Sequence, residues 1–456
     1  MKIHLQNTLT GEKEEFKAIK EGFVSMYNCG PTVYNYAHIG NLRSYVFADT
    51  LRRMFEYNGY KVNQVINVTD IGHLSSDNDD GEDKMTKALK REGKPLTLTA
   101  MREVADFYFA EFKKDLTALN VELPEHFPFA SDHIKEDIDL VSKLFEKGFT
   151  YTISDGIYFD TSKFPEYGKL GNIKKTDDTE SRIGLNQEKK NSRDFAVWKF
   201  NSELGYEAPF GKGFPGWHIE CSAMSVKYLG PEFDIHTGGI DHIPVHHNNE
   251  IAQSVCAGDP YAKYWMHNAH LNMAGENGSE KMAKSGENFI TLKTLKERGI
   301  DPVALRYVFL TASYSSPLQF SWQTLEGADS ALKKIRIKIQ SIKDLGEVKE
   351  TEFRNLINDD LDTPKALALV WDIIKDDNVS PADKKATILS FDKVLGLELD
   401  KVETFEVPEE VQNLLKERDL ARANKDFTKS DEIREKIENL GFEVKDTAEG
   451  STVSPQ

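Results

Sequence analysis

The stretch VSMYNCGPTVYNYAHIGN, residues 24–41, contains the pattern that decides the fold. Its first part, Val24–Asn28, has the composition of a short strand. The strand is expected to end at Cys29-Gly30-Pro31, because glycine and proline interrupt regular structure. From about His38 to Tyr57 apolar residues recur at helical spacing, and Val62–Val68 is typical of a second strand. Strand, helix and strand in this order predict a parallel β-α-β unit, whose ligand site lies at the carboxyl ends of its strands.

The rest of the chain divides into segments with different patterns. In order these are an exposed polar loop over 75–83, helices over 98–119 and 132–147, short strands over 151–159, a poorly patterned polar stretch over 169–191, an almost wholly helical region over 301–399, and a helix pair with a short sheet-like end from 408. We therefore expect an α/β protein with a mainly α-helical C-terminal half. Its parts are a Rossmann-like nucleotide-binding catalytic domain over 1–275 with an insertion at about 110–212, a connecting segment with a lysine loop over 276–325, a helical bundle over 326–400 and a small domain over 401–456.

Composition limits the function classes. The chain has 456 residues, which favours two to four domains, and only three cysteines, which do not suggest a disulfide framework. No signal peptide or membrane span is evident, so we expect a cytoplasmic protein without membrane contact. The net charge of −17 does not exclude a polyanionic partner, because binding one needs only a local basic surface.

The segment His38-Ile39-Gly40-Asn41 starts the first helix and suits phosphate binding. A helix N-terminus offers unpaired amides and a positive dipole end. Gly40 allows a nucleotide to approach the backbone, while His38 and Asn41 are hydrogen-bond donors for phosphate oxygens in a transition state. For these four residues alone, the alternative is an ordinary helix start with a satisfied histidine.

A second candidate is the lysine loop, Lys281-Met-Ala-Lys284-Ser285, which follows the glycine-containing stretch Gly275–Gly278. Two lysines on a flexible loop can close over a triphosphate and neutralise a developing pyrophosphate. The alternative for an isolated lysine pair is a solvated surface loop.

A third set of residues has the chemistry of a metal site. Cys29 and Cys221 supply thiolates, and His246 and Glu250, four residues apart, face the same way on a helix. Two sulfurs, an imidazole and a carboxylate suit zinc. The alternative is a pair of buried thiols near a polar helix, and Cys256 is expected to be a core residue.

These motifs resemble those of known enzymes. The His38–Asn41 segment and the lysine loop resemble, in the right order, the two signature motifs of class I aminoacyl-tRNA synthetases. The chain resembles the cysteinyl-tRNA synthetase family over essentially its whole length, most specifically in Cys29-Gly-Pro-Thr-Val-Tyr, Ile219-Glu-Cys221-Ser-Ala-Met, Phe233-Asp-Ile-His236, Glu250-Ile-Ala-Gln-Ser and the lysine loop.

The resemblance implies a role for each matching residue. It implies one zinc per chain, held by Cys29, Cys221, His246 and Glu250, that binds the thiolate of substrate L-cysteine. It further implies a cysteine pocket of Gly30, Thr69, Trp217 and His236, and an ATP site, with Mg²⁺ accompanying the nucleotide, made by His38, Gly40, Asn41, Gly238, Asp241, Lys281 and Lys284. The helical bundle would bind tRNA(Cys) and the last domain would lie at its anticodon.

The sequence departs from the family pattern at four places. Asn41 stands where a second histidine is common, and Ala283 where serine is common. The spacer before His246 includes His242, and His247 is the alternative to His246 as the metal ligand. The C-terminal end lacks the aromatic residue and arginines that often close the last domain.

We therefore expect a monomeric cysteine–tRNA ligase that makes cysteinyl-adenylate from ATP and transfers cysteine to tRNA. One alternative is a ligase that couples activated cysteine to an amino-sugar on the same core, but it needs no anticodon-binding region. The other is a catalytically silent paralogue that binds RNA or zinc, which the intact His38, Lys284 and metal candidates disfavour.

Overall fold

A computed structural model of the chain describes residues 1–72, 84–173, 188–275, 278–281, 289–402, 407–447 and 450–455. At its centre is a parallel four-stranded sheet with the order β10-β9-β3-β4. Its strands are β3 (Phe23–Asn28), β4 (Lys61–Ile66), β9 (Glu232–Gly239) and β10 (Tyr261–Asn268), and all three neighbouring pairs are parallel. Helix α1 (Ile39–Tyr57) connects β3 to β4. The predicted β-α-β unit is therefore confirmed, and the Rossmann-like α/β class with it.

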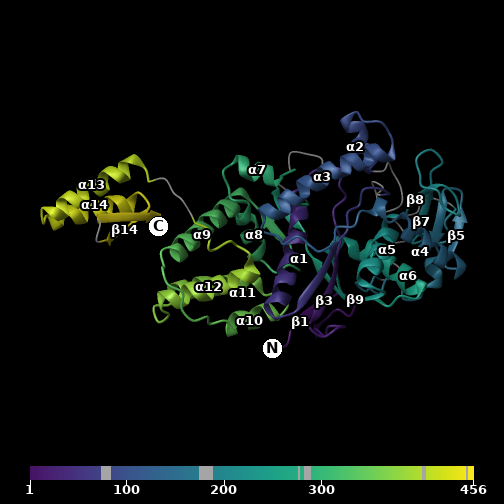
Figure 1. Cartoon of the computed structure of the whole chain (residues 1–456), viewed down its shortest axis with the longest axis horizontal. Helices are drawn as coiled ribbons and strands as arrows, with labels where there is room; N and C mark the ends of the chain where they lie inside the picture. The colour runs from purple at the N-terminus through teal and green to yellow at the C-terminus, as the bar shows by residue number, and fades with distance from the viewer. Residues whose placement is uncertain are drawn as a thin grey trace.

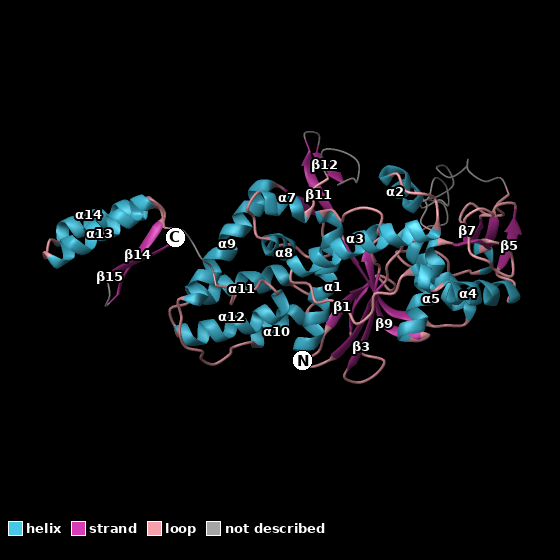
Figure 2. Cartoon of the chain, turned by 45° about the horizontal axis from the view of Figure 1, so that its top comes forward, coloured by secondary structure: helices cyan, strands magenta, loops and turns pink. Residues whose placement is uncertain are grey.

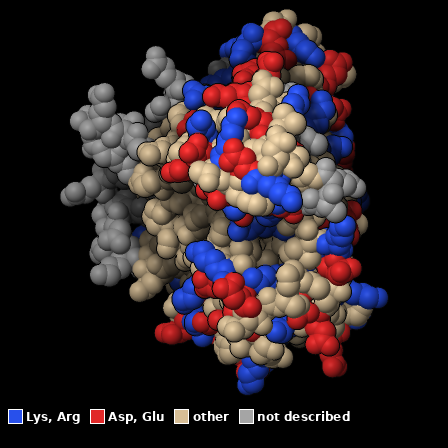
Figure 3. Space-filling model, turned by 90° about the vertical axis from the view of Figure 1, so that its left-hand side faces the viewer, with Lys and Arg blue, Asp and Glu red and all other residues tan. Residues whose placement is uncertain are grey.

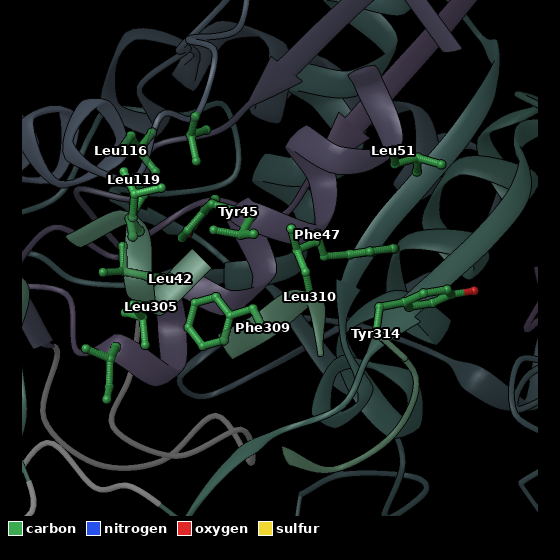
Figure 4. Packing of buried hydrophobic residues seen from close by; sticks show 14 of the residues in the cluster. Leu42, Tyr45, Phe47, Leu51, Leu116, Leu119, Leu305, Phe309, Leu310 and Tyr314 are labelled. Carbon is green, nitrogen blue, oxygen red and sulfur yellow. The ribbon is translucent and has the colours of Figure 1, made fainter. Parts of the chain in front are cut away.

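Helix α1 lies at the heart of the main hydrophobic core. Its buried side chains Leu42, Tyr45, Phe47 and Leu51 belong to the same cluster as residues of two other helices, as Figure 4 shows. Those helices are α3 (Leu98–Ala118), with Leu116, and α8 (Pro302–Leu310), with Leu305, Phe309 and Leu310. Burial of each such side chain contributes about 1.5–3 kcal/mol, so the helix that carries the His38–Asn41 segment is firmly held.

The chain between β4 and β9 forms a second layer of structure. It contains α2 (Lys84–Glu92), α3, α4 (Ile134–Glu146) and α5 (Trp217–Leu229), with short 3-10 turns at Ala130–Asp132 and Thr161–Lys163. An antiparallel sheet of order β5-β6-β7-β8 comprises β5 (Thr150–Ile153), β6 (Gly156–Phe159), β7 (Phe195–Phe200) and β8 (Gly213–Pro215). This sheet lies on the right of Figure 1, opposite the helical bundle. The expected exposed loop over 75–83 lies outside the described residues.

The polypeptide after β9 leads first to the metal candidates and then to the bundle. A 3-10 turn (Ile240–His242) and a π-helical turn (Ile243–His247) precede α6 (Asn248–Ala257). After β10, strands β11 (Leu271–Gly275), β12 (Gly278–Lys281) and β13 (Leu318–Phe320) form a small sheet of order β12-β11-β13. The expectation of an almost wholly helical region over 301–399 is confirmed, and its one strand among the described residues is β13, which pairs in parallel with β11.

The helical bundle packs beside α1. Helices α7 (Leu292–Glu297) and α8 lead into it. The bundle comprises α9 (Trp322–Gln340), α10 (Thr351–Asn358), α11 (Thr363–Lys375) and α12 (Pro381–Leu395), and Figure 2 shows these four helices on one side of the sheet. The fully buried Arg306 of α8 joins the two parts. Its Nη1 lies 2.6 Å from Oδ2 of Asp49 on α1, and its Nε donates to the carbonyl of Leu395 at 2.6 Å.

The two ends of the chain form small units. The N-terminal hairpin pairs β1 (His4–Asn7) with β2 (Glu12–Glu15). At the other end, α13 (Glu409–Ala423), α14 (Phe427–Asn439), β14 (Phe442–Thr447) and β15 (Gly450–Pro455) share their own core of Val411, Ile433, Ile437 and Val444. Within the described residues, no helix has both the length and the apolar character that a membrane crossing requires.

Candidate active site and metal cluster

A cavity of about 400 Å³ lies at the carboxyl ends of the parallel strands. It is lined by most of the residues that the sequence singled out: Cys29, Gly30, His38, Gly40, Asn41, Thr69, Trp217, Cys221, Gly238, Asp241 and His246. His236 and Glu250 are fully buried and hydrogen-bonded to each other behind this wall. The side chain of Lys281 and the whole of Lys284 lie outside the described residues. The structure thus gathers residues that are up to 217 positions apart (29 to 246) in one place.

The floor of the cavity requires a glycine at position 30. The Gly30 amide donates to Oδ1 of Asn67 at 2.8 Å, and a Cβ on Gly30 would lie 1.5 Å from the Asn67 carbonyl oxygen. The chain there runs beside the end of β4, since Thr69 N donates to the Pro31 carbonyl and Val33 N to that of Thr69. No larger residue fits without moving one of these two segments, so the close approach fixes the position of Cys29 beside the cavity.

The metal candidates form a buried cluster. One ligand atom from each of Cys29, His246, His247 and Glu250 lies within 4.8 Å of all the others. Cys29 Sγ is 3.1 Å from His247 Nε2, and His246 Nε2 is 3.1 Å from Glu250 Oε1. Cys221 is not in this tightest set, but its thiol is hydrogen-bonded to Cys29 and to His246. The cluster therefore holds both the set that the resemblance implies and the alternative ligand His247.

The electrostatics of the cluster suit a cation. The hydrogen bond from Cys29 lowers the pKa of Cys221 to about 6, whereas burial raises the pKa of Cys29 well above its usual value. Burial opposes the ionisation of Glu250, but His236 and His246 hold the pKa of its carboxyl far below the usual range. Burial likewise opposes the charge on His246, yet Glu250 and Cys221 raise its pKa to about 10. One thiolate and one carboxylate thus face a single imidazolium whose proton a metal can replace.

Outer hydrogen bonds orient the imidazoles. Nδ1 of His218 is 2.7 Å from Nδ1 of His246, and Nε2 of His267 is 2.7 Å from Nδ1 of His247. Thr8 Oγ1 lies 2.8 Å from the other nitrogen of His267. Partners of this kind are typical of metal sites, where they fix the tautomer and orientation of the ligand rings. Sequence reasoning missed His218 and His267. The signal available for His218 was its place on the same helix as the candidate ligand Cys221, three residues earlier, whereas β10, which carries His267, contains no predicted site residue.

The donor set fits zinc. Zinc favours four ligands drawn from thiolate, imidazole and carboxylate, and all three occur here within a protein interior. Glu250 is fully buried, and its Oε1 lies 3.1 Å from His246 Nε2, so this oxygen and this imidazole can serve as ligands of one ion. The cluster can therefore hold a metal. The expectation that Cys256 is a core residue is confirmed: it is buried in a separate hydrophobic cluster.

On the opposite side of the cavity, the start of α1 is closed by a reciprocal cap. Nδ1 of His38 accepts from the Asn41 amide at 3.1 Å, and Oδ1 of Asn41 accepts from the His38 amide at 3.4 Å. This pairing places the proton of a neutral His38 ring on Nε2. Asn41 takes part in this cap through both its side-chain oxygen and its backbone amide. The residue that departs from the family pattern therefore still stabilises the start of α1.

Comparison with known proteins decides the family. A family model described as the tRNA synthetases class I (C) catalytic domain matches residues 15–330, and one described as the cysteinyl-tRNA ligase anticodon binding domain matches residues 404–453. The chain is 46% identical over 462 residues to cysteine–tRNA ligase 1 of Burkholderia lata. The match covers 99% of this chain and 96% of that protein. The chain belongs to the cysteine–tRNA ligase family. Within this family it is also 40% identical over 498 residues to the enzyme of Treponema denticola, which covers 99% of each chain.

Solved structures agree on the fold. Methionyl-tRNA synthetase of Mycobacterium tuberculosis, in complex with methionyl-adenylate, has a TM-score of 0.55 to this chain at 13% identity, covering 82% of this chain and 90% of that one. At this identity the likeness supports the class I synthetase fold alone. The match of the anticodon-binding model speaks against the amino-sugar ligase alternative, which needs no such region.

Proposed function

We propose that the protein, a cysteine–tRNA ligase, selects its amino acid through one zinc ion held by Cys29, Cys221, His246 and Glu250. The observation that carries this proposal is the buried cluster of sulfur, imidazole and carboxylate groups in the wall of the cavity. When bound, zinc supplies a soft Lewis acid for which a thiolate is a better ligand than a hydroxyl group. Cysteine would thereby be separated from serine, a near-isostere that an apolar pocket distinguishes by only about 10–200-fold.

The residues around the cluster would position the rest of cysteine. Trp217 begins α5 and lines the cavity, with its ring 4.5 Å from that of His246, so it bounds the space beside the thiol. Gly30 and Thr69 line the floor, where backbone groups can hold the amino acid. His236 stays behind the wall and orients Glu250 at 2.9 Å. We therefore assign His236 an indirect role in the cysteine pocket, in which it positions the Glu250 carboxylate.

The other half of the cavity would hold ATP. Gly238 and Asp241, at the end of β9, line the part that we assign to the adenosine ribose, while His38, Gly40 and Asn41 line the part assigned to the phosphates. Adenylate formation is an in-line attack of the cysteine carboxylate on the α-phosphate, which depends on positioning and charge stabilisation. Lys281 and Lys284 would neutralise the departing pyrophosphate together with Mg²⁺.

Transfer to tRNA(Cys) would use the C-terminal half. We assign tRNA binding to the bundle over 326–400 and the anticodon side to 401–456, and we expect a cytoplasmic monomer. The last domain has its own core, so it can be removed as a unit. A chain ending at residue 402 should retain cysteine-dependent pyrophosphate exchange but lose most tRNA charging. Full charging by the shortened chain would show that this domain has another purpose.

The experiment that tests amino-acid selection is ATP–pyrophosphate exchange with cysteine and with serine. We expect exchange with cysteine, and rejection of serine at this step. Serine-dependent ATP hydrolysis in the presence of tRNA would contradict the proposal, because it would reveal an editing step that selection by zinc makes unnecessary.

A further inference from the structure

We propose that Tyr36 and Phe107 form a stacking platform for the unpaired 3′-terminal nucleotides of tRNA at the mouth of the cavity. This inference rests on the proposed use of the cavity for cysteinyl-adenylate, since the tRNA end must reach that intermediate. The two residues come from different parts of the chain: Tyr36 precedes α1 by three positions, and Phe107 lies on α3.

The two rings are neighbours and face solvent. Tyr36 is 39% exposed and Phe107 is 51% exposed, with their ring centroids 6.4 Å apart. Tyr108 supports both from beneath: its centroid lies 5.2 Å from that of Tyr36 and 5.1 Å from that of Phe107, each in an edge-to-face arrangement. Tyr108 itself is only 7% exposed. The platform thus has a rigid base and two accessible rings.

The platform is continuous with the reaction cavity. Tyr36 and Tyr108 line the same cavity as His38 and Cys29. A nucleotide whose ribose hydroxyl enters this cavity can place its neighbours along the wall that residues 34–37 and α3 contribute. Unpaired bases expose their faces, and each base stacked on an aromatic side chain is worth about 1–3 kcal/mol by alanine substitution.

The charge around the platform suits a polyanion. Residues 84–118, which form α2, α3 and their connection, contain eight Lys and Arg against five Asp and Glu, a net charge of +3 in a chain of −17. Helix α2 packs against α3 near the top of Figure 1. The cationic residues of this segment are Lys84, Lys87, Lys90, Arg91, Lys94, Arg102, Lys113 and Lys114. The face shown in Figure 3, seen from the side of α13 and α14, instead mixes both signs of charge closely.

Arg91 fastens this basic segment to the platform. Its Nη2 donates to the Tyr34 carbonyl at 2.6 Å and to the Tyr108 hydroxyl at 3.0 Å, and its guanidinium lies 5.6 Å from the centroid of the Tyr108 ring. Cations beside exposed aromatic rings are the combination by which single-stranded nucleic acid is bound without sequence readout. The geometry therefore favours the single-stranded tRNA end over a folded protein partner.

The test compares two tRNAs on matched variants. Binding is measured by fluorescence anisotropy for Phe107→Ala, Tyr36→Ala and Tyr36→Phe, with tRNA(Cys) intact and with its last three nucleotides removed. Each alanine variant should bind intact tRNA about 5- to 150-fold more weakly, and Tyr36→Phe should bind it like the parent, because the ring is kept. All variants should bind the shortened tRNA as the parent does.

The inference is overturned if alanine weakens both tRNAs equally or weakens neither; the second result would leave the patch to a protein partner. Cysteine-dependent pyrophosphate exchange of Phe107→Ala is measured alongside and should equal that of the parent. Absence of exchange in the parent protein would instead overturn the proposed function, so the two failures are distinguishable.

Discussion

Nε2 of His236 lies 2.9 Å from Oε2 of Glu250, and both side chains are completely buried. The same carboxylate oxygen accepts a hydrogen bond from the Tyr261 hydroxyl at 2.6 Å. With Oε2 held twice from one side, Oε1 is directed toward His246, 3.1 Å away, in the metal cluster. The orientation of one proposed ligand thus depends on residues that are themselves not ligands.

Loss of the Tyr261 hydroxyl should weaken metal binding. Tyr261→Phe keeps the ring and removes the bond to Glu250, so zinc affinity should fall about 10- to 100-fold. Competition with a zinc-binding dye measures this. Tyr264→Phe on the same strand is the control, because its hydroxyl bonds the backbone of Lys17 and Glu15 instead. An unchanged affinity in Tyr261→Phe would remove this residue from the metal site.

The cysteines should differ in their effect on metal content. Protein prepared without chelator should contain about one zinc per chain, and Cys29→Ser or Cys221→Ser should lower that content, because hard hydroxyls replace thiolates. Cys256→Ser is the matched control, since Cys256 belongs to the core beside α4. Elemental analysis decides the matter, and metal-free parent protein would contradict the zinc proposal.

Lys284→Ala should depress adenylate formation much more than cysteine binding. The lysine is proposed to act on charge that develops in the transition state, and such interactions appear in kcat rather than KM. Pyrophosphate exchange kinetics measure both. Lys293→Ala on α7, whose side chain is 82% exposed, should leave both constants unchanged. A higher KM for cysteine with kcat unaffected would argue against the assigned role.

Asp137 should make stability depend on pH. It is completely buried on α4, neither of its oxygens has a hydrogen-bond partner among the described residues, and burial raises its pKa well above the usual value. The folded state then holds a proton that the unfolded chain releases near pH 4, so stability falls as pH rises from there toward the folded pKa, by up to about 1.4 kcal/mol per pH unit.

Asp137→Asn removes this pH-dependent loss of stability. The unfolding temperature of the variant, relative to that of the parent, should therefore increase as pH rises from 4 to 8. Thermal unfolding at pH 4, 6 and 8 measures the difference. Asp139→Asn on the same helix is the control, because Asp139 is exposed and paired with Lys135. Parallel pH profiles for parent and Asp137→Asn would show that Asp137 is ionised in the folded protein.

The sequence predicted the parts of the fold that repeat locally. The helical spacing of apolar residues in α1 and the strand-like composition of β3 and β4 each lie within one short segment of sequence. The β-α-β unit could therefore be predicted directly. Strand β13 could not, because its three residues acquire their pairing from β11, some 47 positions earlier. Helix α2 was also missed, since its lysine-rich sequence has few apolar residues to show its period.

The same limit applies to the site. Site residues at strand ends and around His246 could be predicted from the sequence. At these positions a residue type suited to metal or nucleotide binding stands where a ligand site is expected. The supporting contacts of His218, His267 and Tyr261 join separate elements, and only the packed structure brings them to the cluster. The choice between Cys221 and His247 as a ligand is likewise a matter of three-dimensional distance rather than of spacing.

The most direct test of the account is X-ray absorption spectroscopy at the zinc edge, with and without substrate. Ligation by Cys29, Cys221, His246 and Glu250 predicts two sulfur neighbours in the free protein, three after cysteine is added, and still two with serine. A single sulfur in the free protein would assign the fourth position to His247 in place of Cys221. A sulfur count that cysteine leaves unchanged would contradict the central claim that the metal binds the substrate thiolate.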